Sequence, residues 1–332
     1  EFYGVEVIER FEAGRTVRDV RAAVSYVIGT APVHIAPATA EARAPYIEAD
    51  IIIRRPEDYV AAFGAFDAAP GYSLARDVHA FFGKDRGVGV GTLIVRNVFD
   101  PARHLVDGQP DPSAVTAADI VGGLDEAGKP KGLEAARYTY GKFGFFPRRI
   151  LAGHYGRLQA VRTRMLAIAK QVRAHAIVDL PGGMTVQQAI AARGVGQPYQ
   201  LGDDRLVYCW PQMLAFDPVT KGASLQPLSS HFSGIWNELV AQPDSADDDG
   251  GVAASPSNRV MPDVSGMEVE TYSNPNDPSA DIQLLRASGI VTADMGVWGK
   301  GIVTWGNNAS SHPARSDITR KLHVRAMYAA LH

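Results

Sequence analysis

Apolar residues recur at helical spacing over residues 157–173 and form continuous runs on both sides of that segment. Within the segment, five apolar residues follow one another every three or four positions: Leu158, Val161, Met165, Ile168 and Val172. This spacing predicts an amphipathic helix. The runs at 149–152, 174–180 and 205–210 are apolar without alternation, as buried parallel strands are. The alternation of strand and helix predicts an α/β fold, with a mainly parallel central sheet flanked by helices.

The rest of the chain divides into similar elements. Further strands are expected at 3–8, 22–29, 46–53, 92–98, 289–293 and 301–305. Further helices are expected at 74–83, 131–143, 185–193, 228–240, 278–288 and near 315–331. Ser73 stands directly before one of these helices and is expected to be its N-cap, and Thr185 opens another.

Proline and glycine are concentrated at 99–113, which predicts a boundary. We therefore expect an N-terminal arm and strand at 1–29 and a smaller β-rich inserted domain at 30–112. The remaining residues, 113–332, are expected to form the α/β core domain.

Composition narrows the possible functions. The chain has 332 residues, 46% of them hydrophobic, which is enough for a sizeable core. The formal net charge of −3 disfavours a general nucleic-acid binder. The apolar runs are far shorter than the ~20 residues that span a bilayer, so no membrane insertion is expected. The single cysteine, Cys209, lies in an apolar run and is typical of a reducing cytoplasm.

Motifs that would indicate catalysis are weak. The glycines of 87–91 follow a predicted helix and precede a strand, the reverse of a dinucleotide-binding loop. Ser73 lacks both the preceding strand and the following glycine of a nucleophile elbow. The nine histidines have no metal-ligand spacing. We expect no catalytic set, metal or cofactor, and therefore not an enzyme.

Charge is unevenly distributed along the chain. Residues 135–178 contain nine Lys and Arg residues and no Asp or Glu. The candidate basic patch is formed by Arg157, Arg162, Arg164 and Lys170. The candidate acidic patch is formed by Asp244, Asp247, Asp248 and Asp249, which lack the spacing of a calcium loop. Separated charges of this kind suit contact between copies of one chain, although two solvated faces are an equal alternative. An α/β enzyme with a non-local active site and a nucleic-acid-binding module using residues 137–173 also remain open.

Ten segments in a fixed order carry a resemblance to a known family. They lie at 3–9, 15–32, 119–135, 145–153, 173–193, 207–223, 231–239, 255–258, 284–292 and 301–311. Among them are the turn GTAP, the pattern GGLDEAGKPKGLEA, the helix sequence HFSGIWNEL and the run GIVTWGNN. Together they resemble the contractile tail sheath protein of myovirus-type phages and prophages. Asn308 departs from the family, which usually has Arg there. Family members continue past the segment that ends here at His332, so the family's C-terminal domain is expected to be absent.

The resemblance implies a structural subunit that polymerises around an inner tail tube and contracts to drive the tube through a cell envelope. The implied partners are other copies of the chain, the tube protein, the baseplate and the tail terminator. The implied location is the virion tail, after assembly in the bacterial host cytoplasm. A strand that pairs with a neighbouring subunit is assigned to Tyr3, Gly4, Val5, Glu6, Val7 and Ile8. The two charged patches become candidate contacts between subunit bodies, and residues 30–112 are expected to face outward.

Overall fold

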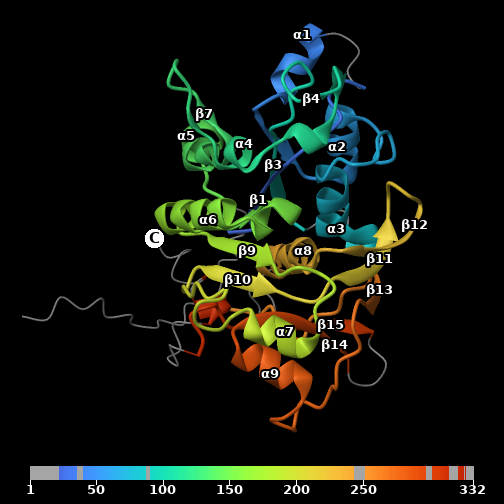
Figure 1. The fold of residues 1–332 in the computed structure, drawn as a ribbon, viewed down its shortest axis with the longest axis vertical. Coiled ribbons are helices and arrows are strands. Elements are labelled where there is room, and N and C mark those ends of the chain that lie inside the picture. Colours follow the sequence, from blue (N-terminus) through green and yellow to red (C-terminus); the bar gives the residue numbers. More distant parts are fainter. Residues whose placement is uncertain are drawn as a thin grey trace, which may run out of the picture.

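A computed structural model describes residues 22–35, 40–86, 90–242, 251–296, 301–313, 321–324 and 326. The expected strand at 3–8 and most of the expected helix at 315–331 lie outside these residues. The described chain is built around one large sheet whose strands succeed one another along the long axis of the molecule (Figure 1).

The large sheet has eight strands in the order β15-β14-β10-β9-β8-β1-β3-β2. Their bounds are β1 Val24–Gly29, β2 Asp50–Ile53, β3 Thr92–Asn97, β8 Arg149–Leu151, β9 His175–Asp179, β10 Leu206–Cys209, β14 Ile290–Met295 and β15 Ile302–Trp305. Only the two outermost strands, β2 and β15, pair antiparallel with their neighbours. The predicted α/β class with a mainly parallel central sheet is therefore confirmed.

The placement of the N-terminal strands differs from the prediction. β1 lies inside the large sheet, between β3 and β8, and β2 extends the same sheet beyond β3. The assignment of these strands to an arm and to a separate β-rich unit at 30–112 is wrong in this respect. The reason is that β1 is buried along its whole length and needs a partner at both edges. Hydrophobic pattern shows that a strand is buried but not which strand it pairs with. The outward orientation of residues 30–112 stays a prediction.

Five of the longer helices, α3, α6, α7, α8 and α9, agree with the predicted ones to within a few residues, whereas no helix was predicted at the position of α2. Their bounds are α2 Pro56–Phe63, α3 Leu74–Arg86, α6 Gln159–Val172, α7 Val186–Ala191, α8 Leu228–Ala241 and α9 Asp281–Ala287. Gly83 interrupts α3 with non-helical backbone angles. The helix expected at 131–143 divides into a 3-10 segment, Gly132–Tyr138, followed by α5, Thr139–Phe143.

Shorter elements fill the connections. The remaining helices are α1 Ala40–Arg43, α4 Ala117–Val121 and the 3-10 turns Ala44–Tyr46, Pro112–Ala114 and Gly153–Arg157. A three-stranded sheet has the order β12-β11-β13, with β11 Met213–Asp217, β12 Gly222–Gln226 and β13 Val264–Met267. Two small hairpins are formed by β4 Leu105–Val106 with β5 Gln109–Pro110, and by β6 Gly123–Leu124 with β7 Pro130–Lys131.

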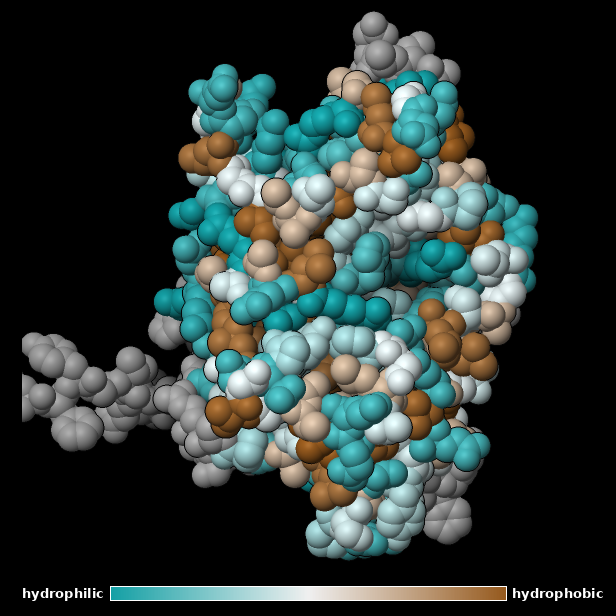
Figure 2. Space-filling view, in the orientation of Figure 1, coloured by the Kyte–Doolittle hydropathy of each residue, from teal (hydrophilic) through white to brown (hydrophobic). Residues whose placement is uncertain are grey.

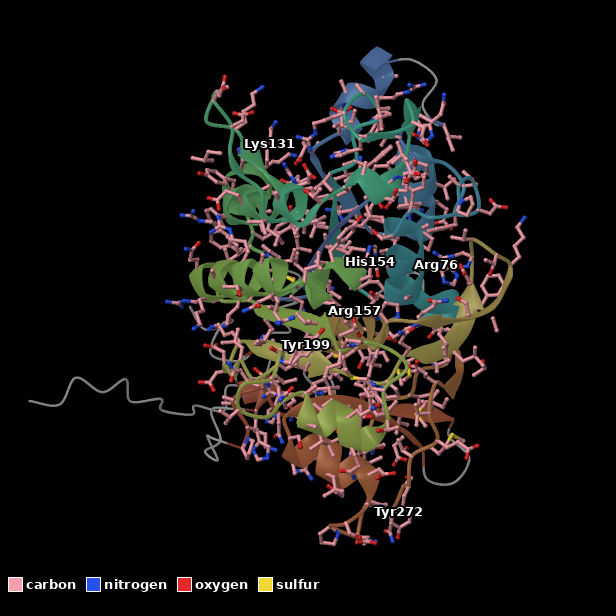
Figure 3. The ribbon with its side chains drawn as sticks, viewed as in Figure 1. Arg76, Lys131, His154, Arg157, Tyr199 and Tyr272 are labelled. Atoms are coloured by element: carbon pink, nitrogen blue, oxygen red, sulfur yellow. The ribbon has the colours of Figure 1, made fainter. Side chains whose placement is uncertain are left out.

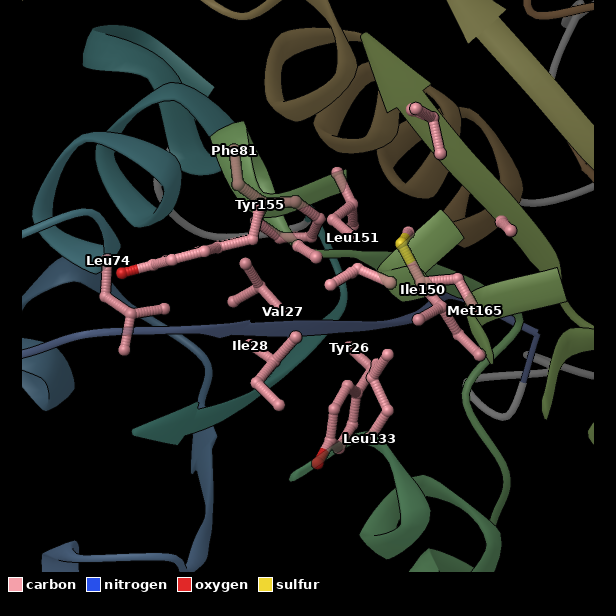
Figure 4. Packing of buried hydrophobic residues seen from close by; sticks show 14 of the residues in the cluster. Tyr26, Val27, Ile28, Leu74, Phe81, Leu133, Ile150, Leu151, Tyr155 and Met165 are labelled. Carbon is pink, nitrogen blue, oxygen red and sulfur yellow. The ribbon is translucent and has the colours of Figure 1, made fainter. Parts of the chain in front are cut away.

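The core consists of two apolar clusters, which lie on opposite sides of β9 and β10. In β10, Leu206 and Tyr208 belong to the cluster that contains α6, whereas Val207 and Cys209 belong to the cluster that contains α8. This is the alternation that a strand covered on both faces requires. In β1, Val27 points to one side of the strand and its two neighbours point to the other (Figure 4). The sheet is thereby fixed between layers of helices.

Candidate contact surfaces and the residues behind the sequence motifs

Arg162, a member of the candidate basic patch, belongs to the interior of the fold. It is 3% exposed. Its Nη1 donates to the Arg157 carbonyl oxygen at 3.0 Å, and its Nη2 donates to the Pro198 carbonyl oxygen at 2.6 Å. Its guanidinium carbon lies 4.4 Å from the centre of the Tyr199 ring. These contacts occupy the side chain within its own chain, so Arg162 is a poor probe of an external contact.

Arg164 is held by a carboxylate that lies just outside the acid-free stretch. The Glu134 side chain is 4% exposed and pairs with both Arg137 and Arg164. The Arg164 side chain remains 30% exposed. The acid-free stretch begins one residue after Glu134. A count of charges within that stretch therefore left out the carboxylate that pairs with Arg137 and Arg164. Two arginines of the basic stretch, Arg137 and Arg164, are therefore paired with a carboxylate of the same chain.

Lys170 and Arg157 are the remaining members of the candidate basic patch. The Lys170 side chain is 54% exposed, and its Nζ lies 2.5 Å from Oδ2 of Asp203. Arg157 is half-buried and lies near the middle of the face seen in Figure 3, close to His154 and Tyr199. Of the four, Lys170 is the most exposed, whereas Arg164 is partly exposed and already paired with Glu134. Their contact with another copy stays a prediction.

Two of the predicted sites cannot be placed. The acidic patch at Asp244, Asp247, Asp248 and Asp249 lies outside the described residues. The same holds for the inter-subunit strand at Tyr3, Gly4, Val5, Glu6, Val7 and Ile8. Both assignments stay predictions.

The GTAP turn is the point where β1 is fastened to α3. The Thr30 amide donates to Ser73 Oγ, and the Ser73 amide donates to Thr30 Oγ1, both at 3.1 Å. Ser73 does stand before α3, as expected for an N-cap, but its hydroxyl accepts from Thr30 in this contact. A side chain on Gly29 would place its Cβ 2.3 Å from Ser73 Oγ. The turn therefore requires a small residue at 29 and a hydroxyl at 73.

The HFSGIWNEL sequence forms the middle of α8 and packs on both the sheet and α3. The Ser233 and Ser25 hydroxyls are 2.9 Å apart, and Ser25 also donates to Asn237 Oδ1 at 3.0 Å. A Cβ on Gly234 would lie 2.0 Å from the main-chain oxygen of Phe81. The small and polar residues of this sequence are therefore explained by the close approach of α8 to its neighbours.

Two further motifs are joined to one another. Gly306 donates its amide to Ser257 Oγ at 2.9 Å, and the Thr304 hydroxyl donates to the Pro256 oxygen at 2.7 Å. These bonds connect segment 255–258 with segment 301–311 across the outer edge of β15. In segment 119–135, Gly122 and Gly132 meet so closely that a Cβ on either would lie under 3 Å from the other's backbone. The described motifs in segments 15–32, 119–135, 231–239, 255–258 and 301–311 are therefore structural joints.

The interior also contains carboxyl groups that resemble catalytic residues. Burial raises the pKa of Asp77 to about 7, and its Oδ1 accepts from the Ser230 hydroxyl at 2.9 Å. Burial also raises the pKa of Asp179, which accepts from the Ser229 amide. Asp77 is 4% exposed and Asp179 is 3% exposed. Carboxyl groups buried to this degree cannot be reached by a substrate without opening the core.

Other features that would indicate an enzyme have structural explanations. Cys209 is buried, and burial raises the pKa of its thiol, which disfavours a nucleophilic role. A groove of about 460 Å³ beside α9 is lined by proline, alanine, amides, Arg286 and His312, without a carboxylate or thiol. Within the described ranges, no group of three or more His, Cys, Asp or Glu could hold a metal ion.

No helix among the described residues is long and apolar enough to cross a bilayer. Polar and apolar residues are interspersed over the face seen in Figure 2. The fold and its joints thus define a rigid α/β body without a recognisable catalytic centre in the part that the structure describes.

Two known proteins with a similar sequence are named as tail sheath proteins. The chain is 29% identical to the tail sheath protein of Burkholderia phage BcepMu, over 97% of this chain and 77% of the phage protein. It is 27% identical to a putative prophage major tail sheath protein of Pseudomonas aeruginosa strain UCBPP-PA14, over 98% of this chain and 74% of that protein. No family model matches the chain.

A solved structure with a similar fold also comes from a sheath. The helical sheath of the anti-feeding prophage in its contracted state superposes with a TM-score of 0.58 and 17% identity. The match covers all of this chain and 74% of that one. At this identity the likeness shows a shared fold. Together with the sequence relatives, it confirms the resemblance to contractile tail sheath proteins that the ten segments predicted.

Proposed function

We propose that the chain is a structural subunit of a contractile tail sheath, which polymerises with other copies around an inner tube. The observation that carries this proposal is the similarity to two proteins named as tail sheath proteins over nearly the whole described body. The shared fold with a helical sheath in the contracted state supports the same role. In this role the subunit acts mechanically and catalyses no reaction.

In the proposed mechanism, the α/β body moves as one unit and is joined to neighbouring bodies by terminal strands. The joints between β1 and α3 and between α8 and the sheet keep the body intact while it moves as one unit. Extended terminal strands would connect neighbouring bodies, because main-chain pairing holds subunits together regardless of their side chains. The assembled sheath would contract by rotation of whole bodies and drive the tube through a cell envelope.

Partners and location follow as parts of the same proposal. The inner tube protein would be the template, the baseplate would start assembly and the tail terminator would end it. Assembly would take place in the cytoplasm of the bacterial host, and the product would be part of the virion tail.

A sedimentation assay tests the proposed function. The full chain is mixed with assembled tubes of an inner tail tube protein and centrifuged at a speed that pellets tubes but not monomers. Co-pelleting that saturates at a fixed ratio of the two proteins is expected. A chain that stays in the supernatant at every concentration, with tubes present in the pellet, would contradict the proposal.

A further inference from the structure

The hairpin of the three-stranded sheet presents apolar side chains to solvent. β11 and β12 form this antiparallel hairpin, which lies on the right-hand side of Figure 1. Their pairing places Leu214 opposite Leu225 and Phe216 opposite Ala223 on one face. Phe216 is 46% exposed and Leu225 is 45% exposed. Ala223 is also exposed, whereas Leu214 is half-buried. These four residues, all apolar, form what we call the outer hairpin face.

The buried face of the same hairpin carries polar side chains beside Met213 and Ala215. They are Asp217, Ser224 and Gln226, and both Asp217 and Gln226 are 0% exposed. An antiparallel sheet with one solvated face usually places apolar residues inside and polar residues outside. Here the buried face is mixed and the exposed face is wholly apolar, which is not the pattern of a face selected for contact with water.

The buried polar groups have partners within the chain. Asp217 Oδ2 accepts from Nε of Arg76 in α3 at 3.0 Å and from the Ser224 hydroxyl at 3.1 Å. Gln226 Nε2 donates to the main-chain oxygen of Phe216 at 2.8 Å. These bonds fasten the hairpin to its own sheet and to α3, so they explain the composition of the buried face. They do not explain the outer hairpin face.

The tip of the hairpin is also held against the segments beside it. Lys221 Nζ lies 2.6 Å from Oδ2 of Asp67, which stands between α2 and α3. The Phe216 ring lies 5.7 Å from the ring of His79 in α3, measured between their centres. A surface that is ordered before it binds loses less conformational entropy on binding. The outer hairpin face is therefore suited to dock against another surface.

The size of the face indicates the kind of partner. Phe216 and Leu225 are each less than half exposed and Leu214 less still. The face therefore offers far less than the ~800 Å² that each partner buries in a stable complex of two proteins. A contact this small is effective where several neighbours hold each molecule at once, as in a polymer of identical chains.

We propose that the outer hairpin face is a contact surface for a second copy of this chain in an assembled polymer. The inference rests on the proposed function, which supplies the polymer. Copies in a helical polymer are joined by heterologous contacts, so the face meets a different surface of the next copy. Its four side chains are exposed in the free chain and become buried on assembly.

A photoreactive residue at position 216 tests which molecule covers the face. The full chain is made with p-benzoylphenylalanine in place of Phe216, mixed with assembled tubes of an inner tail tube protein, pelleted and irradiated. Mass spectrometry is expected to find a product that joins two copies of the chain. The same protein irradiated without tubes, at a concentration at which it is monomeric, should not form this product. If the pelleted protein gives only products with the tube protein, only products within one chain or no product, the proposal is overturned.

Substitutions test whether the apolar character of the face matters. Phe216→Thr combined with Leu225→Thr removes the two most exposed apolar side chains and keeps a residue that strands favour. The unfolding midpoint should change by less than about 4 °C. The chain concentration at half-maximal pelleting with tubes should rise at least about tenfold. Phe216→Leu combined with Leu225→Met keeps the face apolar and should pellet like the wild type.

Val60→Thr is the control for loss of an exposed apolar side chain elsewhere. Val60 lies on α2 and is 41% exposed, so this variant should also pellet like the wild type. If the wild type itself does not pellet with tubes, the proposed function and this inference fail together. If the wild type pellets and the double threonine variant pellets at the same concentration, only the contact is overturned. Loss of the folded state in the threonine variant would leave the cross-link as the deciding measurement.

Discussion

Thr30 and Ser73 hold each other by two hydrogen bonds of 3.1 Å, each from the main-chain amide of one residue to the side-chain oxygen of the other. The residues are 43 positions apart, and the pair fixes the end of β1 against the start of α3. β1 lies inside the large sheet, where it pairs with β3 on one side and with β8 on the other. The pair is therefore a joint on which the orientation of α3 depends.

Ser73→Ala should destabilise the fold by about 1–2 kcal/mol, because the buried Thr30 amide loses its acceptor. Chemical denaturation measures the change. Ser113→Ala is the control, because Ser113 is exposed and its main-chain amide keeps its bond to Asp111 in the variant, and it should stay within about 0.5 kcal/mol of the wild type. Gly29→Ala should be less harmful in the Ser73→Ala background than alone, because the clash with Ser73 Oγ is removed. If the effects of Gly29→Ala and Ser73→Ala on the free energy of unfolding were strictly additive, the close contact between Gly29 and Ser73 would be contradicted.

Gly234→Ala should destabilise the fold by about 3 kcal/mol or more. The new methyl group would meet the main-chain oxygen of Phe81 at 2.0 Å, so α8 and α3 would have to separate. Gly141→Ala is the control, because Gly141 also lies in a helix and a Cβ there meets nothing within 4 Å. The control should be neutral or stabilising by about 0.5–1 kcal/mol. Equal midpoints of denaturation for the two variants would show that the approach of α8 to α3 is not tight.

The buried carboxyl group of Asp77 should make the free energy of unfolding decrease as the pH rises from ~4 to about 7. The unfolded carboxyl loses its proton near pH ~4, whereas the folded one keeps it to about pH 7. The folded state thus binds the extra proton between these values, and the stabilisation present at low pH is lost as the pH passes through 7. The difference in unfolding free energy between wild type and Asp77→Asn should fall by up to about 4 kcal/mol over this range.

Denaturation of both proteins at a series of pH values checks this prediction. Glu126→Gln, at the exposed tip of the hairpin between β6 and β7, controls for the loss of one negative charge. A difference between wild type and Asp77→Asn that does not change with pH would mean that Asp77 ionises in the folded protein as it does in the unfolded chain.

Lys170→Glu tests the candidate basic patch with little effect on the fold. Lys170 is exposed and its pair with Asp203 lies at the surface, so the change in stability should be under about 1 kcal/mol. If the patch contacts another copy, polymerisation should weaken markedly in the sedimentation assay. Lys129→Glu, at an exposed position outside the stretch 137–173, should polymerise like the wild type. Unchanged polymerisation of Lys170→Glu would remove this residue from the contact.

Local patterns in the sequence predicted much of the fold. The spacing of Val161, Met165 and Ile168 predicted α6, and the apolar runs predicted β9 and β10. These elements are determined by which of their own faces is buried, and that information lies within a few residues. The pairing of β1 with β3 and β8 depends on segments far away in the sequence, so no local pattern contained it.

The candidate basic patch shows the same difference between what a local sequence pattern contains and what depends on distant residues. The acid-free stretch was visible in the sequence, but Glu134 lies one residue before it and pairs with Arg164 across 30 positions. A count of charges along the sequence does not distinguish Arg149 and Arg162 from the other basic residues of the stretch, although both are buried. The charge of a residue can be counted along the chain, whereas its burial and its partner depend on the tertiary structure.

The central claim, that the chain is a sheath subunit, is tested most directly by electron microscopy of the purified full chain with its tube protein. The account predicts tubes of larger diameter than the bare inner tube, with helical order that repeats the α/β body along the axis. Bare tubes beside dispersed monomers, at concentrations where the wild-type fold is intact, would contradict it.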